Sequence, residues 1–135
     1  MNTNTIRNFS LACMLSLVAP LEVAAQRLAV PEYVTCDRNQ LTSWQGEITR
    51  VTRQGNGIDL AIATDYGTSE SLTMTGASWE EVLAQFRLAG RPFRADDWDR
   101  LFDTEGNHQP GLRAIVWLCQ AADQQPIVNW QLPGR

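Results

Sequence analysis

The chain has 135 residues, of which 11 are basic and 15 acidic, so its formal net charge is −4. This length fits one domain. An acidic chain with dispersed arginines lacks the clustered positive charge that a phosphate backbone requires, so the composition argues against nucleic acid as a partner.

The first 25 residues have the three parts of a secretory signal peptide. Arg7 supplies a positive head, residues 9–21 are mostly apolar, and small residues precede Gln26. A membrane anchor is the alternative, but the apolar run is shorter than the roughly 20 residues that a span requires. We therefore predict cleavage after residue 25 and a periplasmic or secreted protein that keeps no membrane span.

Two cysteines, Cys36 and Cys119, remain after removal of the leader. An even number of cysteines in an exported domain usually forms disulfides, because the compartment is oxidising. A redox-active pair would favour Cys-x-x-Cys spacing instead. The sequence therefore predicts a structural Cys36–Cys119 disulfide that closes most of the mature chain.

The N-terminal part of the mature chain predicts an extended arm followed by three strands. Residues 26–43 form the expected arm, since Pro31 excludes a regular helix. Residues 44–53 are rich in β-branched side chains and predict a strand, with a bulge near residues 49–50 because Ile48 and Val51 have opposite parity. Glycine-containing turns then separate two further strands with alternating apolar residues, over 58–63 and 69–75.

The apolar residues then no longer fall at every second position but at every third or fourth, which is the spacing of a helix. Ser78 and Glu81 match a capping box, and a stripe from Trp79 to Phe86 predicts a helix that ends near Gly90. Residues 96–102 predict a second, shorter helix with aspartates at its positive end. Residues 112–119 are almost continuously apolar, as in a central strand buried on both faces, and residues 127–132 predict a last strand.

The expected order is β-β-β-α-(α)-β-β over residues 44–135, a mostly β domain. This order resembles that of the OB-fold, a small five-stranded barrel, which the disulfide would here staple shut. The resemblance concerns the strand pattern of residues 44–132 and rests on no family motif. An SH3-like barrel and an open α+β sheet remain alternatives.

Five tryptophans are the most prominent aromatic feature. Trp79 and Trp98 lie on helical stripes with apolar neighbours, which predicts core positions. Trp117 shares strand parity with Cys119, so it would cover the disulfide if that face packs beneath the arm. An exposed stacking platform for a glycan or peptide is the alternative for the strand tryptophans.

No residue pattern predicts catalysis, a metal site or a cofactor. The carboxylates of residues 96–103 lack the alternating oxygen ligands and central glycine of a calcium loop, and capping explains them better. His108 is the only histidine and lies in a polar loop without a nucleophile motif. Phosphate-binding glycine loops, zinc spacings and dinucleotide motifs are absent from the sequence.

These observations favour an exported, non-enzymatic binding or accessory domain of the bacterial cell envelope, with a protein or glycan as ligand. On an OB-like barrel the ligand surface is the face of strands 2 and 3 with its flanking loops. Surface arginine and tyrosine residues are common interface anchors. The candidate contact residues are Arg53, Asp59, Tyr66, Ser71, Arg91 and Arg94.

Two alternative functions remain open. A carboxylate-dependent hydrolase would use Asp59, Asp65 or the carboxylates of residues 96–99. An inhibitor of an extracytoplasmic hydrolase is suggested by Tyr33-Val-Thr-Cys36, which resembles the tyrosine-cysteine start of the small disulfide-bonded lysozyme inhibitors. Those inhibitors carry a Ser-Gly-x-x-Tyr loop that this chain lacks, so the family is not assigned.

Overall fold

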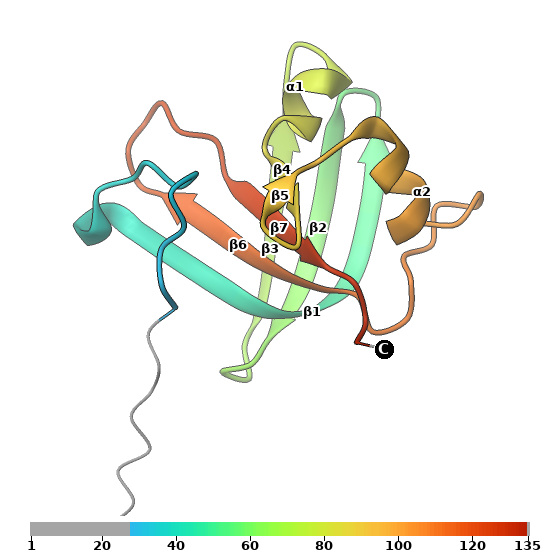
Figure 1. Cartoon of the computed structure of the whole chain (residues 1–135), viewed down its shortest axis with the longest axis horizontal. Helices are drawn as coiled ribbons and strands as arrows, with labels where there is room; N and C mark the ends of the chain where they lie inside the picture. The colour runs from blue at the N-terminus through green and yellow to red at the C-terminus, as the bar shows by residue number, and fades with distance from the viewer. Residues whose placement is uncertain (1–27, 135) are drawn as a thin grey trace, which may run out of the picture.

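The computed structural model describes residues 28–134, and most of its regular structure is β-sheet (Figure 1). The predicted signal peptide lies outside the described residues. The strands are β1 (Leu41–Gln54), β2 (Gly57–Thr64), β3 (Ser69–Thr75), β4 (Phe86–Leu88), β5 (Arg91–Pro92), β6 (Arg113–Cys119) and β7 (Ile127–Gln131). The helices are η1 (Arg38–Gln40), α1 (Trp79–Leu83), η2 (Ala95–Asp97) and α2 (Trp98–Leu101).

The strands form one mixed sheet in the order β3-β2-β1-β6-β7-β4-β5. Every neighbouring pair is antiparallel except β4 and β7, which run parallel. The prediction of a mostly β domain is confirmed. The expected closed five-stranded barrel is not formed by the described residues, because β3 and β5 remain the two edges of a seven-stranded sheet.

Strand β1 belongs to both halves of this sheet. Its residues 41–47 pair with β6, and its residues 46–54 pair with β2. The register to β2 shifts between Ile48 and Arg50, which leaves Thr49 as the extra residue of a β-bulge. The predicted bulge is confirmed, and it lets Ile48 and Val51 face the same side despite their opposite parity. The strand begins at Leu41, so residues 41–43 belong to it and not to the arm.

Gly46 lies where the two halves of the sheet meet. It pairs with Thr64 of β2 and with Ala114 of β6. A Cβ atom at this position would lie 2.0 Å from the carbonyl oxygen of Ala63, a distance that only backbone movement could relieve. The close approach of β2 to β1 therefore requires glycine here.

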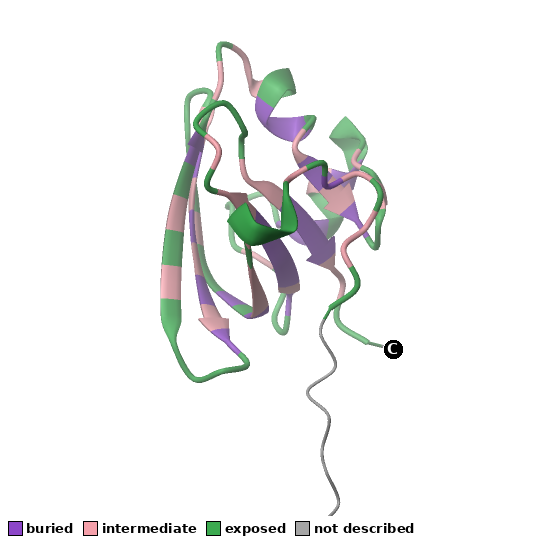
Figure 2. Cartoon of the chain, turned by 90° about the vertical axis from the view of Figure 1, so that its left-hand side faces the viewer, coloured by how far each residue is buried: buried purple, intermediate pink, exposed green. Residues whose placement is uncertain are grey.

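The main core lies on the inner side of the curved sheet, against α1 and α2. Its fully buried members come from nearly every strand and include Ile48, Leu60, Phe86 and Trp130. Buried residues alternate with less buried ones along β2, whereas β6 has a continuous buried run. Figure 2 shows both kinds of strand. Trp79 and Trp98 are half-buried, pack edge-to-face at 5.1 Å and contact this core, as the sequence predicts.

The first helix is shorter than expected. The Ser78 hydroxyl accepts from the amide of Glu81, which confirms the predicted cap, although the Glu81 carboxylate accepts from the amide of Ala77 and not from that of Ser78. The helix ends at Leu83, and Phe86–Leu88 form β4. Phe86 satisfies helical spacing and strand alternation equally, and parallel pairing with β7 decides between them.

Strand β6 is buried on both faces, as predicted. Ala114 and Val116 face the main core, while Ile115 and Trp117 face the N-terminal arm. The arm crosses over β6 and the start of β1 (Figure 1), and the Cys36–Cys119 disulfide attaches it there. The disulfide is thus confirmed and indicates an oxidising, extracytoplasmic environment. No helix between residues 28 and 134 has the length and apolarity that a membrane crossing requires.

We predict that Gly46→Ala lowers the free energy of unfolding by about 3 kcal/mol, because the methyl group overlaps the backbone of β2. Urea unfolding followed by tryptophan fluorescence measures the change. Gly134→Ala is the control, since no atom lies within 4 Å of a Cβ there, and a change below about 0.5 kcal/mol is expected. Equal stability of both variants would contradict the close approach.

We also predict that the double substitution Cys36→Ser and Cys119→Ser costs about 4 kcal/mol. The two cysteines are 83 residues apart in sequence, so the crosslink removes much conformational entropy from the unfolded chain. Urea unfolding of the wild type with and without reductant should reproduce the loss. A cost below about 1 kcal/mol would show that packing alone holds the arm on β6.

Candidate functional site

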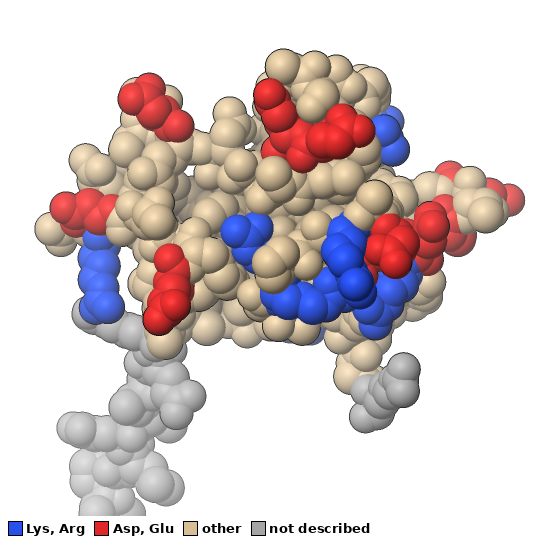
Figure 3. All heavy atoms as spheres, turned by 45° about the horizontal axis from the view of Figure 1, so that its top comes forward, with Lys and Arg blue, Asp and Glu red and all other residues tan. Residues whose placement is uncertain are grey.

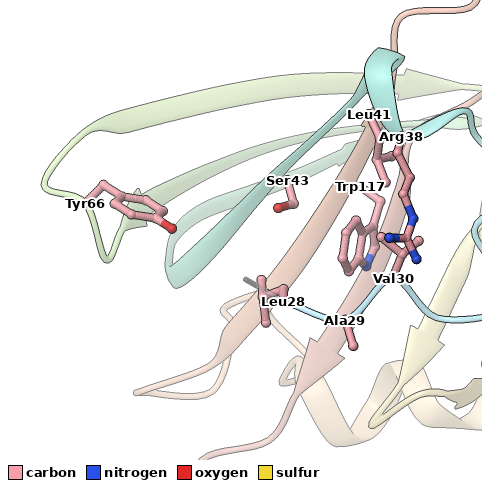
Figure 4. Close-up of a pocket in the computed structure, with 8 residues that line it drawn as sticks. All are labelled: Leu28, Ala29, Val30, Arg38, Leu41, Ser43, Tyr66 and Trp117. Atoms are coloured by element: carbon pink, nitrogen blue, oxygen red, sulfur yellow. The ribbon is translucent and has the colours of Figure 1, made fainter. Parts of the chain in front are cut away.

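A hollow on the outer face of the sheet lies between the β2–β3 hairpin and the N-terminal arm (Figure 4). We call it the aromatic hollow, and its volume is about 420 Å³. Tyr66 lies at one end and Trp117 at the other, with Ser43 between them (Figure 4). The lining residues are Leu28, Ala29, Val30, Arg38, Leu41, Ser43, Tyr66 and Trp117.

The backbone around Tyr66 is held in place by hydrogen bonds. The neighbouring Asp65 accepts two from Arg113 of β6, at 2.8 and 2.6 Å, and its amide donates to the carbonyl of Gln45 at 2.8 Å. The amide of Gly67 donates to Thr64, and a φ of 85° at Gly67 completes the turn. Tyr66 is nevertheless 86% exposed, so the fold presents this residue without covering it.

The far end of the aromatic hollow is part of a second, smaller core beneath the arm. Trp117 is 4% exposed and packs with Val34 and Ile115, and Cys36 and Leu41 border this cluster. The face of β6 that carries Trp117 therefore packs beneath the arm, and Cys36 of the disulfide borders the same cluster. Burial raises the pKa of Tyr33 in the same cluster, although the Arg87 guanidinium 4.9 Å from its ring opposes the shift.

The exposed apolar surface is concentrated at this hollow. Among residues 28–134, Leu28 and Tyr66 are the large apolar side chains that remain exposed, and both line it. Arg38 has no ion-pair partner among the described residues and adds a positive charge at the rim. The arrangement suits an apolar group inserted between Leu28 and Tyr66, with a polar or acidic group near Arg38.

A second, polar hollow lies on the same outer face, over β2 and β3. It has a volume of about 350 Å³ and brings together the predicted residues Asp59 and Ser71 with Arg50 and Thr73. The Thr73 hydroxyl donates a hydrogen bond to the Asp59 carboxylate. Two of the six candidate contact residues, Asp59 and Ser71, therefore lie together on β2 and β3.

The other four candidate contact residues are dispersed. Tyr66 belongs to the aromatic hollow, and Arg53 lies on the inner side of the sheet with its guanidinium 3.9 Å from the Trp79 ring centre. Arg91 is bound to Asp97 near the opposite edge of the sheet, and Arg94 is a neighbour in the same segment. The six residues thus do not form one surface.

Sequence reasoning missed the role of Leu28, Arg38 and Leu41 in the aromatic hollow. These residues reach it because the arm folds back over β6, and the Cys36–Cys119 pair was the available signal that it does so. Nothing in the local sequence indicates that the tip of the β2–β3 hairpin lies opposite the arm.

The predicted acidic cluster divides into structural roles. Asp97 is buried and accepts bonds from both terminal nitrogens of Arg91 at 2.7 Å and from the amide of Arg94 at 2.8 Å. These contacts, above all the Arg91 hydrogen bonds, hold the pKa of Asp97 well below its usual range. Asp103 caps a turn, and the amide of Asn107 lowers its pKa.

The lowered pKa values of Asp97 and Asp103 do not suit a general acid, because a carboxyl group in that role requires a raised pKa. Within residues 28–134, no group of three His, Cys, Asp or Glu side chains is arranged to hold a metal ion. His108 forms an isolated β-bridge with Phe102. Its observed position is that of a loop residue.

Comparisons with protein-family models, curated proteins and solved structures found no match to this chain.

We predict that Asp97→Asn lowers the free energy of unfolding by about 2 kcal/mol at pH 7, because it leaves Arg91 without its buried counter-charge. The folded-state pKa of Asp97 is depressed, so its contribution is present above the unfolded value near 4 and is lost as the pH falls below it. The difference between wild type and variant should therefore shrink between pH 5 and pH 2.

Urea unfolding across this pH range measures the effect. Asp99→Asn is the matched control, since Asp99 is exposed in α2, and its cost should stay below about 0.5 kcal/mol. A pH-independent difference between wild type and Asp97→Asn would show that the carboxylate charge does not carry the effect.

Proposed function

We propose that this chain is an exported, non-enzymatic binding domain of the bacterial cell envelope, and that the aromatic hollow holds a segment of a partner protein. The observation that carries this proposal is the convergence of exposed apolar surface, Leu28 and Tyr66, on one hollow. An exposed apolar patch on an otherwise polar surface is typical of an interaction site. Tyrosine is also among the residues that most often dominate binding energies.

Export is supported by the disulfide and by the leader-like residues 1–25. The periplasm or the extracellular space is the proposed location. An extracytoplasmic hydrolase is one class of partner compatible with this proposal.

A protein segment fits the aromatic hollow better than a glycan. Sugar rings present hydroxyl groups around their edges and need several polar partners, whereas Arg38 and Ser43 are the polar side chains beside Tyr66 in this hollow. Leu28, Val30 and Leu41 instead offer contacts to an apolar side chain. A glycan would find more polar partners in the hollow of Asp59 and Ser71. This hollow lies on the strands that bind ligands in an OB-fold.

A hydrolase is less well supported by the observed carboxylates. Asp65 is paired with Arg113, and Asp97 is buried against Arg91. Asp59 accepts from Thr73 on an open strand face. A pair of carboxylates across a cleft, as glycoside hydrolysis requires, would need groups that are not already engaged in such contacts.

Selection from a displayed random-peptide library against the oxidised protein tests the proposal. The selected peptides should share an apolar side chain next to an acidic residue. Tyr66→Ser should weaken their binding at least about tenfold, because it removes the ring that forms one wall. Tyr66→Phe should keep binding within about threefold, and Ser71→Ala in the polar hollow should leave it unchanged.

Thermal unfolding of each variant checks that the fold is retained. Peptides that bind Tyr66→Ser as tightly as wild type would overturn the assignment to the aromatic hollow. Failure to select peptides, together with glycan-array binding that Ser71→Ala abolishes, would favour a glycan ligand on β2 and β3 instead.

A further inference from the structure

A third hollow lies near the opposite edge of the sheet, where β4, β5, α2 and the end of β7 meet. Its volume is about 370 Å³ and it shares no lining residue with the aromatic hollow. We call it the arginine hollow. Its lining residues are Leu88, Ala89, Arg91, Arg100, Gln131 and Leu132.

The arginine hollow retains a positive charge. Arg91 binds both oxygens of Asp97 at 2.7 Å, and Arg100 comes within 3.5 Å of one of the same oxygens. Two guanidinium groups therefore face one buried carboxylate. The Arg100 side chain is 52% exposed and makes no closer ion pair among the described residues, so most of its donors are available to a ligand.

Positive and negative side chains lie next to each other on the face that surrounds this hollow. On the face shown in Figure 3 a group of arginine side chains lies directly beside a group of acidic side chains. The chain as a whole has a net charge of −4, whereas residues 87–103 carry four arginines and four aspartates, so this segment is less acidic than the chain's average. The excess of one guanidinium is confined to the lining of the hollow, where Arg91 and Arg100 share the Asp97 carboxylate, and such a charge attracts anions.

The remaining walls of the arginine hollow are apolar or neutral. Leu88 is 2% exposed, and Ala89 and Leu132 lie beside it at the surface. Gln131 adds a side-chain amide that can donate a hydrogen bond to an oxygen. The hollow thus combines one unneutralised guanidinium, one amide and a small apolar surface.

The turn that forms one wall is held in an unfavourable conformation. Ala89 has φ of 49°, in the left-handed region that favours glycine or asparagine. Hydrogen bonds hold it there: the amide of Ala89 donates to the carbonyl of Trp130, and the amide of Gly90 donates to the side chain of Asn129, both at 2.9 Å. The wall is therefore fixed by β7 before any ligand arrives.

We propose that the arginine hollow binds a small organic carboxylate. The carboxylate pairs with Arg100 and with the Gln131 amide, and the apolar part of the ligand lies against Leu88 and Leu132. A planar guanidinium matches the two oxygens of a carboxylate, which makes this pairing stronger than a bond to a neutral acceptor. This site is additional to the protein-binding function proposed for the aromatic hollow and does not depend on it.

The same chemical group occurs in a free acid and at the C-terminus of a protein, and three probes distinguish these sources. They are N-acetyl-leucine, N-acetyl-leucinamide, and a serine–glycine peptide that ends in leucine with a free carboxylate. Binding is followed by the backbone amide NMR signals of Ala89, Gly90 and Leu132 in the oxidised protein. N-acetyl-leucine should shift these signals, and the amide should bind at least about tenfold more weakly.

The peptide assigns the source. Binding of the peptide as tight as that of N-acetyl-leucine supports a chain terminus as the ligand. Weaker binding of the peptide supports a free acid, because the mouth of the hollow then excludes the preceding residues.

Arg100→Gln should weaken the binding of N-acetyl-leucine at least about tenfold, because it removes the charge that pairs with the carboxylate. Arg94→Gln is the matched control: Arg94 belongs to the same segment, is 71% exposed and does not line the hollow, so binding should stay within about twofold. Arg91 is left intact because it holds Asp97. Equal binding of acid and amide, or equal loss in both variants, would overturn the proposal.

Discussion

The bend of strand β1 is the constraint on which the rest of the structure depends. One strand hydrogen-bonds to β6 with its first half and to β2 with its second half, and Gly46 is common to both pairings. The absence of a side chain at Gly46 lets the backbone of β2 approach, and the bulge at Thr49 returns Val51 to the inner face. Without this bend the sheet would have no curved inner side to enclose a core between its strands and the two short helices.

The outer side of the same bend creates the candidate binding surfaces. The arm crosses β6 on that side, and the disulfide holds it against Trp117. The tip of the β2–β3 hairpin lies beside Gln45 in the first half of β1, and the Asp65–Arg113 pair fixes it there. The aromatic hollow is the space between these two segments, so it depends on a crosslink, an ion pair and the curvature of one strand together.

Much of the local structure was predictable from the residues. Alternating apolar residues predicted β2 and β3, the conflict between Ile48 and Val51 predicted the bulge, and the continuous apolar run predicted that β6 is buried on both faces. The two cysteines predicted the crosslink and, through the parity of Trp117, the packing beneath the arm. Of the candidate contact residues, Asp59 and Ser71 were predictable as neighbours because they lie on the same face of adjacent strands.

The amino-acid sequence by itself thus determined five of the seven strands (β1, β2, β3, β6 and β7), the bulge and the disulfide, since these depend on alternation, turn residues and cysteine number. Only the tertiary structure decided that Phe86–Leu88 is a strand, because its parallel pairing with β7 outweighs a helical spacing that fits equally well. It also decided that the sheet stays open, that Leu28 and Tyr66 line one hollow, and that Arg91 and Arg100 line another. Such contacts join residues far apart in the chain or on separate elements, and local patterns carry no information about them.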